Sequence, residues 1–433
     1  MSAVQSWTRL PKVRHTRVLH AASRLDALPA LAAGETLIPH GNGRSYSDVA
    51  LNDDGAVLRT RRLDHLMAFD CEAGRITCEG GVLLAEILDL VVPQGWTLPV
   101  VPGTRFVTLG GAIANDVHGK NHHVAGTFGH HVVRFELLRS DGSRMICSAR
   151  ENADWFAATV GGLGLTGLIT WAEIGLQRIA NPFMLTQAKR FATLDAFRQL
   201  DARAEADWPY TVAWIDCLAK AGRGILFTGR HAPAQGDLPA WRERKKSMPV
   251  ETPVSLVNGL SLRLFNAAYY RQPLKAGTQL THYVPYFFPL DAIGNWNLIY
   301  GRAGFYQYQC VVPPDGGHAA IADMLAIIAR HGQGSFLAVL KNFGDRPSPG
   351  MLSFARPGVT LALDFPNHGE ATLKLFAELD AVVAQAGGAL YPAKDSRIPA
   401  DMFRRGFPQW EAFAHFIDPK LRSAFWRRVG ETS

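Results

Sequence analysis

The sequence is poor in cysteine, because its 433 residues contain only five and no two of them form a C-x-x-C pair. The five are Cys71, Cys78, Cys147, Cys217 and Cys310. An odd number of scattered thiols indicates a reducing compartment and argues against a disulfide framework or a zinc ribbon. No apolar run reaches the ~18 residues that a membrane-spanning helix needs. Residues 1–20 lack the apolar segment of a secretory signal, so we expect no Sec signal.

Common nucleotide-binding motifs are also missing from the N-terminal loops, which fit neither G-x-G-x-x-G nor G-x-x-x-x-G-K-[ST]. The net charge of +7 is modest, and no long Lys/Arg block is present. We therefore expect no nucleic-acid partner. The basic segment Arg242–Lys246 is most simply a solvated charged face, and a membrane-docking patch is the alternative.

Two glycine-rich loops are the most informative features that the sequence does contain. The first runs from His40 to Asp48 and the second from Pro102 to His123. Glycine lets the backbone approach a phosphate closely and turn its N–H groups toward it, so two such loops predict a diphosphate held from both sides. A third run, Gly161–Gly167, follows a predicted helix rather than a strand, which argues against a Rossmann turn. It either passes beneath the bound ligand or forms a tight connection.

The length of the chain predicts two domains, and its composition of 47% apolar and 19% charged residues is that of a globular protein. Periodicity predicts strands at 56–59, 75–79, 133–138, 304–312, 335–341 and 358–364, and helices at 82–92, 154–160, 318–330 and 371–386. In the strand 304–312, Gln307 and Gln309 share one face. The segment 231–285 is weakly periodic and predicts a long mobile loop.

The paired loops resemble the PCMH-type FAD-binding domain of the vanillyl-alcohol oxidase superfamily. Two further motifs, His118–His123 and Tyr391–Arg397, are similar to those of the decaprenylphosphoryl-β-D-ribose 2′-oxidase family within it. The similarity runs from about residue 35 to residue 420. It implies a two-domain α+β fold, with the FAD-binding domain at 1–182 and an antiparallel-sheet substrate domain at 183–388. Residues 389–433 would return to the FAD-binding domain.

The resemblance also implies which residues contact FAD. Many relatives carry a His at the position of Arg44 and bond it covalently to the flavin, which Arg cannot do, so the expected FAD is non-covalent. The residues that the family pattern places against FAD are Gly41, Asn42, Gly43, Arg44, Ser45, Tyr46, Gly103, Thr108, Gly110, Gly111, Asn115, His118, Ile169 and Tyr391. Turn chemistry is a second explanation for the small residues among them, and both can hold at once.

The neighbouring side chains of His118, Lys120, His122 and His123 suggest a metal site at first. No carboxylate or thiolate at ligand spacing accompanies them, and Lys120 would repel a cation, so we expect no metal. Structural hydrogen bonding and contact with flavin or substrate are the two remaining interpretations. The resemblance implies that His118 and Lys120 face the flavin and substrate pocket.

Lys394 is predicted to be the key charge of the active site, because the family motif surrounds it. A fixed ammonium group stabilises the negative charge that a flavin gains with a hydride, and it can also orient the substrate hydroxyl. His118 and Tyr46 are predicted to act beside it. Asp395 and Arg397 either pair with each other or brace the loop.

A set of polar and aromatic residues is assigned to the substrate by the same resemblance: Lys120, Trp214, Phe287, Gln307, Gln309, Lys341, Thr360 and Lys394. The amides of Gln307 and Gln309 suit sugar hydroxyls, and a solvent-facing strand side is the alternative. For Trp214 and Phe287 the alternative is core packing. Relatives carry Asn and Cys where Thr360 and Ala362 stand and often Tyr at Phe287, which predicts a smaller and less polar wall.

The activity implied by the resemblance is FAD-dependent oxidation of the 2′-hydroxyl of a polyprenylphosphoryl ribose, the first half of an epimerisation to an arabinose donor. A quinone or oxygen would reoxidise the flavin, and a separate NADH-dependent short-chain reductase would complete the epimerisation. The alternatives are an aldonolactone or alditol oxidase, or a non-catalytic flavin- or sugar-phosphate-binding protein. The simplest expectation is a cytoplasmic protein with peripheral contact to the inner membrane. The aromatic segment His282–Pro289 either admits the lipid tail or forms a buried strand.

Overall fold

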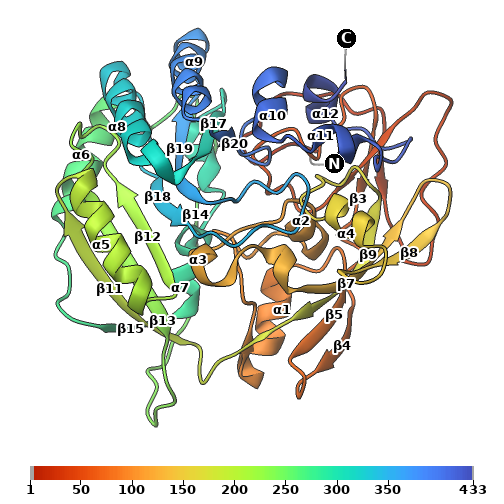
Figure 1. Ribbon diagram of the computed structural model, residues 1–433, viewed down its shortest axis with the longest axis horizontal. Helices are drawn as coiled ribbons and strands as arrows, with labels where there is room; N and C mark the ends of the chain where they lie inside the picture. The colour runs from red at the N-terminus through yellow and green to blue at the C-terminus, as the bar shows by residue number, and fades with distance from the viewer. Residues whose placement is uncertain (1–3, 432–433) are drawn as a thin grey trace.

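Two antiparallel sheets, of five and eight strands, form the framework of the protein (Figure 1). The computed structural model describes residues 4–431. The smaller sheet has the order β4 (Leu66–Asp70), β5 (Arg75–Glu79), β9 (Leu168–Gly175), β7 (Val132–Leu138) and β8 (Arg144–Cys147). The larger has the order β15 (Gln279–His282), β11 (Phe183–Phe191), β13 (Gly224–His231), β12 (Tyr210–Ile215), β18 (Ala338–Phe343), β19 (Gly358–Pro366), β17 (Phe305–Val312) and β20 (Ala389–Leu390).

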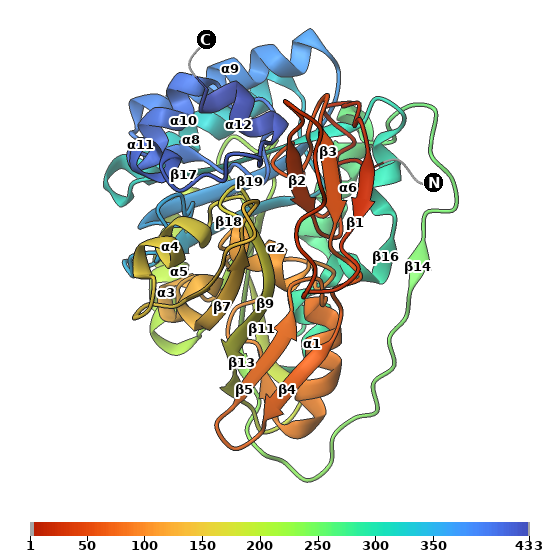
Figure 2. The ribbon, with the colours of Figure 1, turned by 90° about the vertical axis from the view of Figure 1, so that its right-hand side faces the viewer.

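A parallel three-stranded sheet completes the N-terminal part, in the order β1 (Val18–His20), β3 (Ala56–Arg59) and β2 (Leu37–His40). The C-terminal helices α10 (Ala400–Gly406), α11 (Trp410–Ala414) and α12 (Ala424–Val429) return to this part of the chain (Figure 2). Leu37 bridges to Leu421, and the N–H of Ala424 donates to the carbonyl of Leu51 at 2.8 Å. The α+β architecture is confirmed, whereas the boundaries after residues 182 and 388 stay a prediction.

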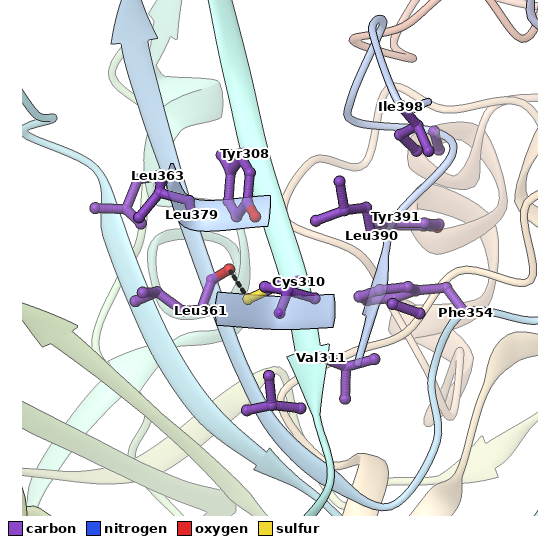
Figure 3. Packing of buried hydrophobic residues seen from close by; sticks show 14 of the residues in the cluster. Tyr308, Cys310, Val311, Phe354, Leu361, Leu363, Leu379, Leu390, Tyr391 and Ile398 are labelled. Atoms are coloured by element: carbon purple, nitrogen blue, oxygen red, sulfur yellow. Dashed lines mark hydrogen bonds between the residues drawn. The ribbon is translucent and has the colours of Figure 1, made fainter. Parts of the chain in front are cut away.

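Three helices cover one face of the larger sheet: α5 (Leu194–Asp207), α8 (Pro314–His331) and α9 (Glu370–Gln385) (Figure 1). Tyr308 and Cys310 of β17 point into this core among Leu361, Leu363 and Leu379 (Figure 3). Because side chains alternate along a strand, Gln307 and Gln309 lie on the opposite face. The predicted alternation of β17 is therefore confirmed, and the free face of the sheet is the one available to a ligand.

The helix predicted at 82–92 is α1 (Leu84–Val91), and its predicted apolar stripe is buried at Leu84, Ile87, Leu88 and Val91. The chain leaves the helix through a short turn that ends at Gly95, which has a φ of 79°. Only glycine adopts this left-handed conformation without strain. The same periodicity argument also located α4 (Ala153–Thr159), α8 and α9.

The prediction of a mobile loop over 231–285 was wrong, because the segment contains β14 (Lys246–Ser247), α6 (Gly259–Arg271) and the strand β15. Asn258 caps α6 by accepting the N–H groups of Leu260 and Ser261, each at 3.1 Å. Periodicity missed α6 because its buried residues are Leu262 and Asn266, whereas Leu260 and Leu264 are exposed. A helix with a polar residue inside and leucines outside has no amphipathic signature.

Two smaller expectations also need correction. The strand predicted at 335–341 begins only at Ala338, because the N–H of Leu337 donates to Oγ of Ser335 in a bend before the strand. The segment His282–Pro289 is not a buried strand, since β15 ends at His282 and the short helix α7 (Tyr283–Phe287) follows. Several of its side chains, Tyr286 and Phe287 among them, line the cavity described next.

Candidate active site

A cavity of about 1090 Å³ extends from the two glycine loops to the free face of the larger sheet. Every residue predicted to contact flavin or substrate lines its wall. The third glycine run also reaches it, through Leu163, Gly164 and Gly167. Segments that lie hundreds of residues apart therefore converge on one space, and the roles of the individual residues stay predictions.

The two glycine loops are joined directly to each other. The side chain of Asn42 donates to the carbonyl of Phe106 at 2.7 Å. A Cβ added to Gly41 would lie 2.4 Å from Oγ1 of Thr108, so no larger residue fits there while Thr108 stays in place. Thr108 in turn caps α2 (Leu109–Ala114) by accepting the N–H of Gly111 at 3.2 Å. The loops thus form a single rigid wall of the cavity.

The C-terminal motif locks onto both glycine loops. The N–H of Tyr46 donates to the carbonyl of Ala393 at 2.9 Å, and Oγ of Ser47 donates to the carbonyl of Pro392 at 2.6 Å. The hydroxyl of Tyr391 donates to the carbonyl of Asn115 at 3.0 Å. These bonds fix the position from which Lys394 enters the cavity.

Lys394 is held above an aromatic ring and beside a buried acid. Its Nζ lies 3.8 Å from the centre of the Tyr46 ring, a cation–π contact. Burial lowers the pKa of Lys394, and attraction to Asp364 opposes that shift. The neighbouring Arg397 forms ion pairs with Asp395 at 2.9 Å and Asp380 at 2.6 Å, which confirms that this pair braces the loop.

His118 lies at the centre of a second group of polar side chains. Its Nδ1 is 2.8 Å from Nζ of Lys341, and its Nε2 is 3.3 Å from the amide nitrogen of Gln309. Burial and the charge of Lys341 hold the pKa of His118 well below its usual range, so the imidazole is neutral. Lys341 also donates to the carbonyl of Gly119 at 2.7 Å, and burial lowers its pKa to about 7. Gln309 reaches Oγ1 of Thr360 at 3.3 Å.

Lys120 is anchored to the end of the short helix α7. Its Nζ donates to the carbonyls of Tyr286 at 2.8 Å and Phe287 at 3.0 Å, and burial lowers its pKa to about 7. This ammonium group therefore fixes the end of α7 and places the Phe287 ring. Trp214 is held similarly, because its indole N–H donates to the carbonyl of Phe336 at 3.0 Å. Both rings are buried and line the cavity, so core packing and pocket lining hold together.

Asp364 is a functional candidate that the sequence analysis missed. It is fully buried on β19, where its Oδ1 accepts the amide of Gln307 at 2.6 Å, and no donor within residues 4–431 meets hydrogen-bond geometry at its Oδ2. Burial raises the pKa of Asp364, and the charge of Lys394 opposes the shift. The alternation that placed Thr360 and Ala362 at the pocket reaches Asp364 two residues further on, so a signal was present.

Trp7 is a second candidate that was missed, and nothing in its sequence context indicated it. The guanidinium carbon of Arg44 lies 4.3 Å from the centre of the Trp7 ring and 5.8 Å from that of Phe106. The N–H of Trp7 donates to the carbonyl of Ser45 at 2.8 Å. The N-terminal segment thus contacts the first glycine loop and contributes Trp7 to the cavity wall.

The residues of the glycine-loop wall fit FAD. Nε of Arg44 and Oδ1 of Asn115 are buried and have no hydrogen-bond partner among the described residues, so this wall offers both a cationic donor and an acceptor. A Cβ added at Gly103 or Gly164 would meet no atom within 4 Å, which leaves room for a ligand against the backbone. Residues 4–431 contain no group of three or more His, Cys, Asp or Glu side chains that could hold a metal ion.

Comparison with known proteins agrees with this geometry. Residues 26–148 match the FAD binding domain family. The fold and the cavity therefore define an FAD-dependent oxidoreductase.

Full-length relatives identify the family more closely. The chain is 35% identical to decaprenylphosphoryl-β-D-ribose oxidase of Mycolicibacterium smegmatis over 407 residues, which cover 89% of this chain and 87% of that protein. It is 33% identical over 377 residues to an uncharacterised protein of Streptomyces coelicolor, covering 81% of this chain and all of that one. Mouse L-gulonolactone oxidase is 32% identical over 177 residues, 40% of this chain and 39% of that enzyme. The chain belongs to the decaprenylphosphoryl-β-D-ribose oxidase family.

Proposed function

We propose that this enzyme oxidises the 2′-hydroxyl of a polyprenylphosphoryl-β-D-ribose to the 2′-keto sugar, the first half of an epimerisation to the arabinose donor. The observation that carries the proposal is the convergence of Lys394, Lys341 and two glutamines on one cavity beside the flavin loops. The relationship to the mycobacterial oxidase along nearly the whole chain supports the same substrate class. FAD, when bound, accepts the hydride.

Oxidation of a secondary alcohol removes a hydride from carbon and a proton from oxygen. Lys394 and Asp364 are the pair that we propose to accept the hydroxyl proton. Burial lowers the pKa of the ammonium group and raises the pKa of the carboxyl group, so the two values approach each other. The cation–π contact with Tyr46 fixes where the ammonium group stands. Lys394 is therefore the residue that we propose to orient the substrate hydroxyl and to stabilise the charge that develops during transfer.

The other polar side chains of the cavity are the ones that we propose to bind the sugar and the phosphate. Gln307 and Gln309 point from β17 into the cavity and offer donors and acceptors to ribose hydroxyls. The ammonium groups of Lys120 and Lys341 make this end of the cavity attractive to an anion. Neutral His118 adds a hydrogen-bonding group without further charge. Trp214, Phe287 and Thr360 form the surrounding wall.

The rest of the reaction sequence requires partners. The reduced flavin has to pass two electrons to a quinone or to oxygen. Return of the ketone to the opposite epimer requires a hydride donor, for which we propose a separate NADH-dependent short-chain reductase. The five cysteines are unpaired, which supports placement in the reducing cytoplasm. Peripheral contact with the inner membrane is a separate part of the proposal, because the proposed substrate carries a prenyl chain. None of the helices within residues 4–431 is long and apolar enough to cross a membrane.

An aldonolactone or alditol oxidase is the second candidate function. Its support is the partial match to L-gulonolactone oxidase, which covers 40% of this chain. Arg44 stands where covalent flavoproteins of the superfamily carry the linking His, which argues against it. A non-catalytic binding protein is the third, and the buried charges of Lys341, Lys394 and Asp364 argue against it, because unused buried charges destabilise a fold.

The test is an anaerobic visible spectrum of the purified protein before and after addition of polyprenylphosphoryl ribose. We expect the flavin band to bleach with this substrate and the flavin to wash out in acid denaturant. Bleaching by a lactone or alditol alone would transfer the assignment to the second candidate. A flavin that none of these compounds reduces would support the binding protein.

A further inference from the structure

An unusually apolar and basic surface lies beside the mouth of the cavity. We define this docking surface as the exposed residues of 241–275 together with Ile293. Its apolar members include Leu260 and Leu264 of α6, which are 70% and 64% exposed, and Val250, Val254 and Leu256 of the preceding segment. Single exposed leucines are ordinary, but a group of this size on one stretch of a water-soluble chain marks an interaction site.

The docking surface is continuous with the cavity. Phe265 of α6 and Ile293 are exposed and also line the cavity wall. Lys246 and Ser247 of β14 pair in parallel with Ile293 and Gly294 of β16 (Ile293–Gly294). Figure 2 shows β14 and β16 near each other at one edge of the molecule. A ligand that leaves the cavity here passes directly onto this surface.

The charge of the surface is strongly positive. Residues 241–275 contain seven basic side chains, Arg242, Arg244, Lys245, Lys246, Arg263, Arg271 and Lys275, against two acids, Glu243 and Glu251. Both acids are already engaged, since Glu251 pairs with Arg9, and Glu243 with Arg105 at 2.6 Å and Lys245 at 3.3 Å. The segment therefore carries five of the seven net charges of the whole protein, and all seven basic residues are exposed.

We propose that this surface docks onto an anionic phospholipid bilayer and opens the cavity toward the membrane. Exposed leucines beside exposed basic groups are the combination that binds an anionic lipid interface, where apolar side chains enter the acyl boundary and each Lys or Arg adds about 1 kcal/mol of attraction. A prenyl chain could then remain in the bilayer while its sugar phosphate enters the cavity. That last step rests on the proposed substrate. Binding to the bilayer gives the proposed peripheral membrane contact a specific surface, and it does not depend on which substrate is oxidised.

Vesicle sedimentation with the FAD-loaded enzyme tests the proposal. We expect binding to phosphatidylglycerol vesicles, little binding to phosphatidylcholine vesicles, and loss of binding at high salt. The double variant Leu260→Ser/Leu264→Ser should bind about tenfold more weakly. The matched control Leu66→Ser/Met67→Ser changes two exposed apolar residues of β4, far from α6 in Figures 1 and 2, and should bind like the wild type.

Three results would overturn the docking proposal. The first is that the wild-type enzyme does not bind phosphatidylglycerol vesicles. The second is that the α6 double variant binds these vesicles as tightly as the wild type does. The third is a lipid-free dimer, detected by light scattering, that dissociates in the α6 double variant, because the surface would then bind a second copy of the chain.

An activity measurement separates this proposal from the proposed function. With a short-chain, water-soluble prenylphosphoryl ribose, the α6 double variant should turn over like the wild type, because neither leucine lines the cavity. With a long-chain substrate in vesicles it should be slower. If the wild type binds vesicles but oxidises neither substrate, the docking surface stands and the proposed function fails.

Discussion

The amide of Gln307 donates to the carboxylate of Asp364 at 2.6 Å and joins β17 to β19 at the floor of the candidate active site. The two residues are direct partners in the strand register. Asp364 also interacts with Lys394, which comes from the C-terminal motif. One buried carboxyl group therefore connects the proposed sugar-binding face to the proposed catalytic charge.

Removal of the Lys394 charge should abolish most turnover. Lys394→Met keeps the length of the side chain and loses the ammonium group, so we expect kcat to fall by about 10²–10³-fold, the usual effect of losing one electrostatic stabiliser. The bound flavin spectrum should persist. Lys374→Met, on the exposed side of α9, is the matched control and should leave kcat unchanged. If the Lys394→Met variant keeps the wild-type kcat, Lys394 has no role in the chemical step.

Asp364→Asn should shift the alkaline limb of the pH–rate profile to lower pH. Burial lowers the pKa of Lys394 to about 8, and the carboxylate of Asp364 opposes that shift. An amide of the same shape removes the opposing charge, so Lys394 should lose its proton at a still lower pH. The measurement is kcat against pH for both proteins. An unchanged limb would show that Asp364 only holds Gln307 in place.

The contact between the glycine loops predicts a rescue experiment. Gly41→Ala should weaken FAD binding, because the new Cβ would lie 2.4 Å from Oγ1 of Thr108 and push the loops apart. Thr108→Ala alone should lower the free energy of unfolding by about 1 kcal/mol, because it removes the side chain that caps α2. The double variant should bind FAD more tightly than Gly41→Ala, as measured by fluorescence titration. Additive losses in the double variant would contradict the contact.

Asp116 should make stability depend on pH in an identifiable way. Its Oδ1 accepts the N–H of Gly129 at 2.8 Å, its Oδ2 accepts Oγ of Ser353 at 2.5 Å, and burial raises its pKa to about 6. A raised carboxyl pKa stabilises the fold fully below the unfolded value, near 4, and this contribution is lost as the pH rises through about 6.

Asp116→Asn does not titrate, so the free energy of unfolding of the wild type relative to this variant should fall between pH 4 and pH 7. The expected fall is at most about 3 kcal/mol. Urea denaturation of both FAD-loaded proteins at several pH values measures it. A difference that stays constant across this range would mean that Asp116 has an ordinary pKa in the fold.

Local sequence was sufficient to predict those strands and helices whose buried and exposed residues alternate regularly. The alternation in β17 placed Gln307 and Gln309 on one face of the strand, and the 3.6-residue period located α1, α8 and α9. It failed at α6, whose exposed leucines and buried Asn266 reverse the usual pattern. That reversal is understandable if the leucines have a partner outside the chain.

The sequence by itself determined the glycine loops, the lysines and the family motifs, because these depend only on residue type and spacing. Only the tertiary structure decided that Gly41 touches Thr108, that Lys341 meets His118, and that Asp364 lies opposite Gln307. These relationships depend on strand register and on contacts between segments up to hundreds of residues apart. Burial in that shared cavity, rather than any local pattern, brings the pKa values of Lys341 and Lys120 to about 7.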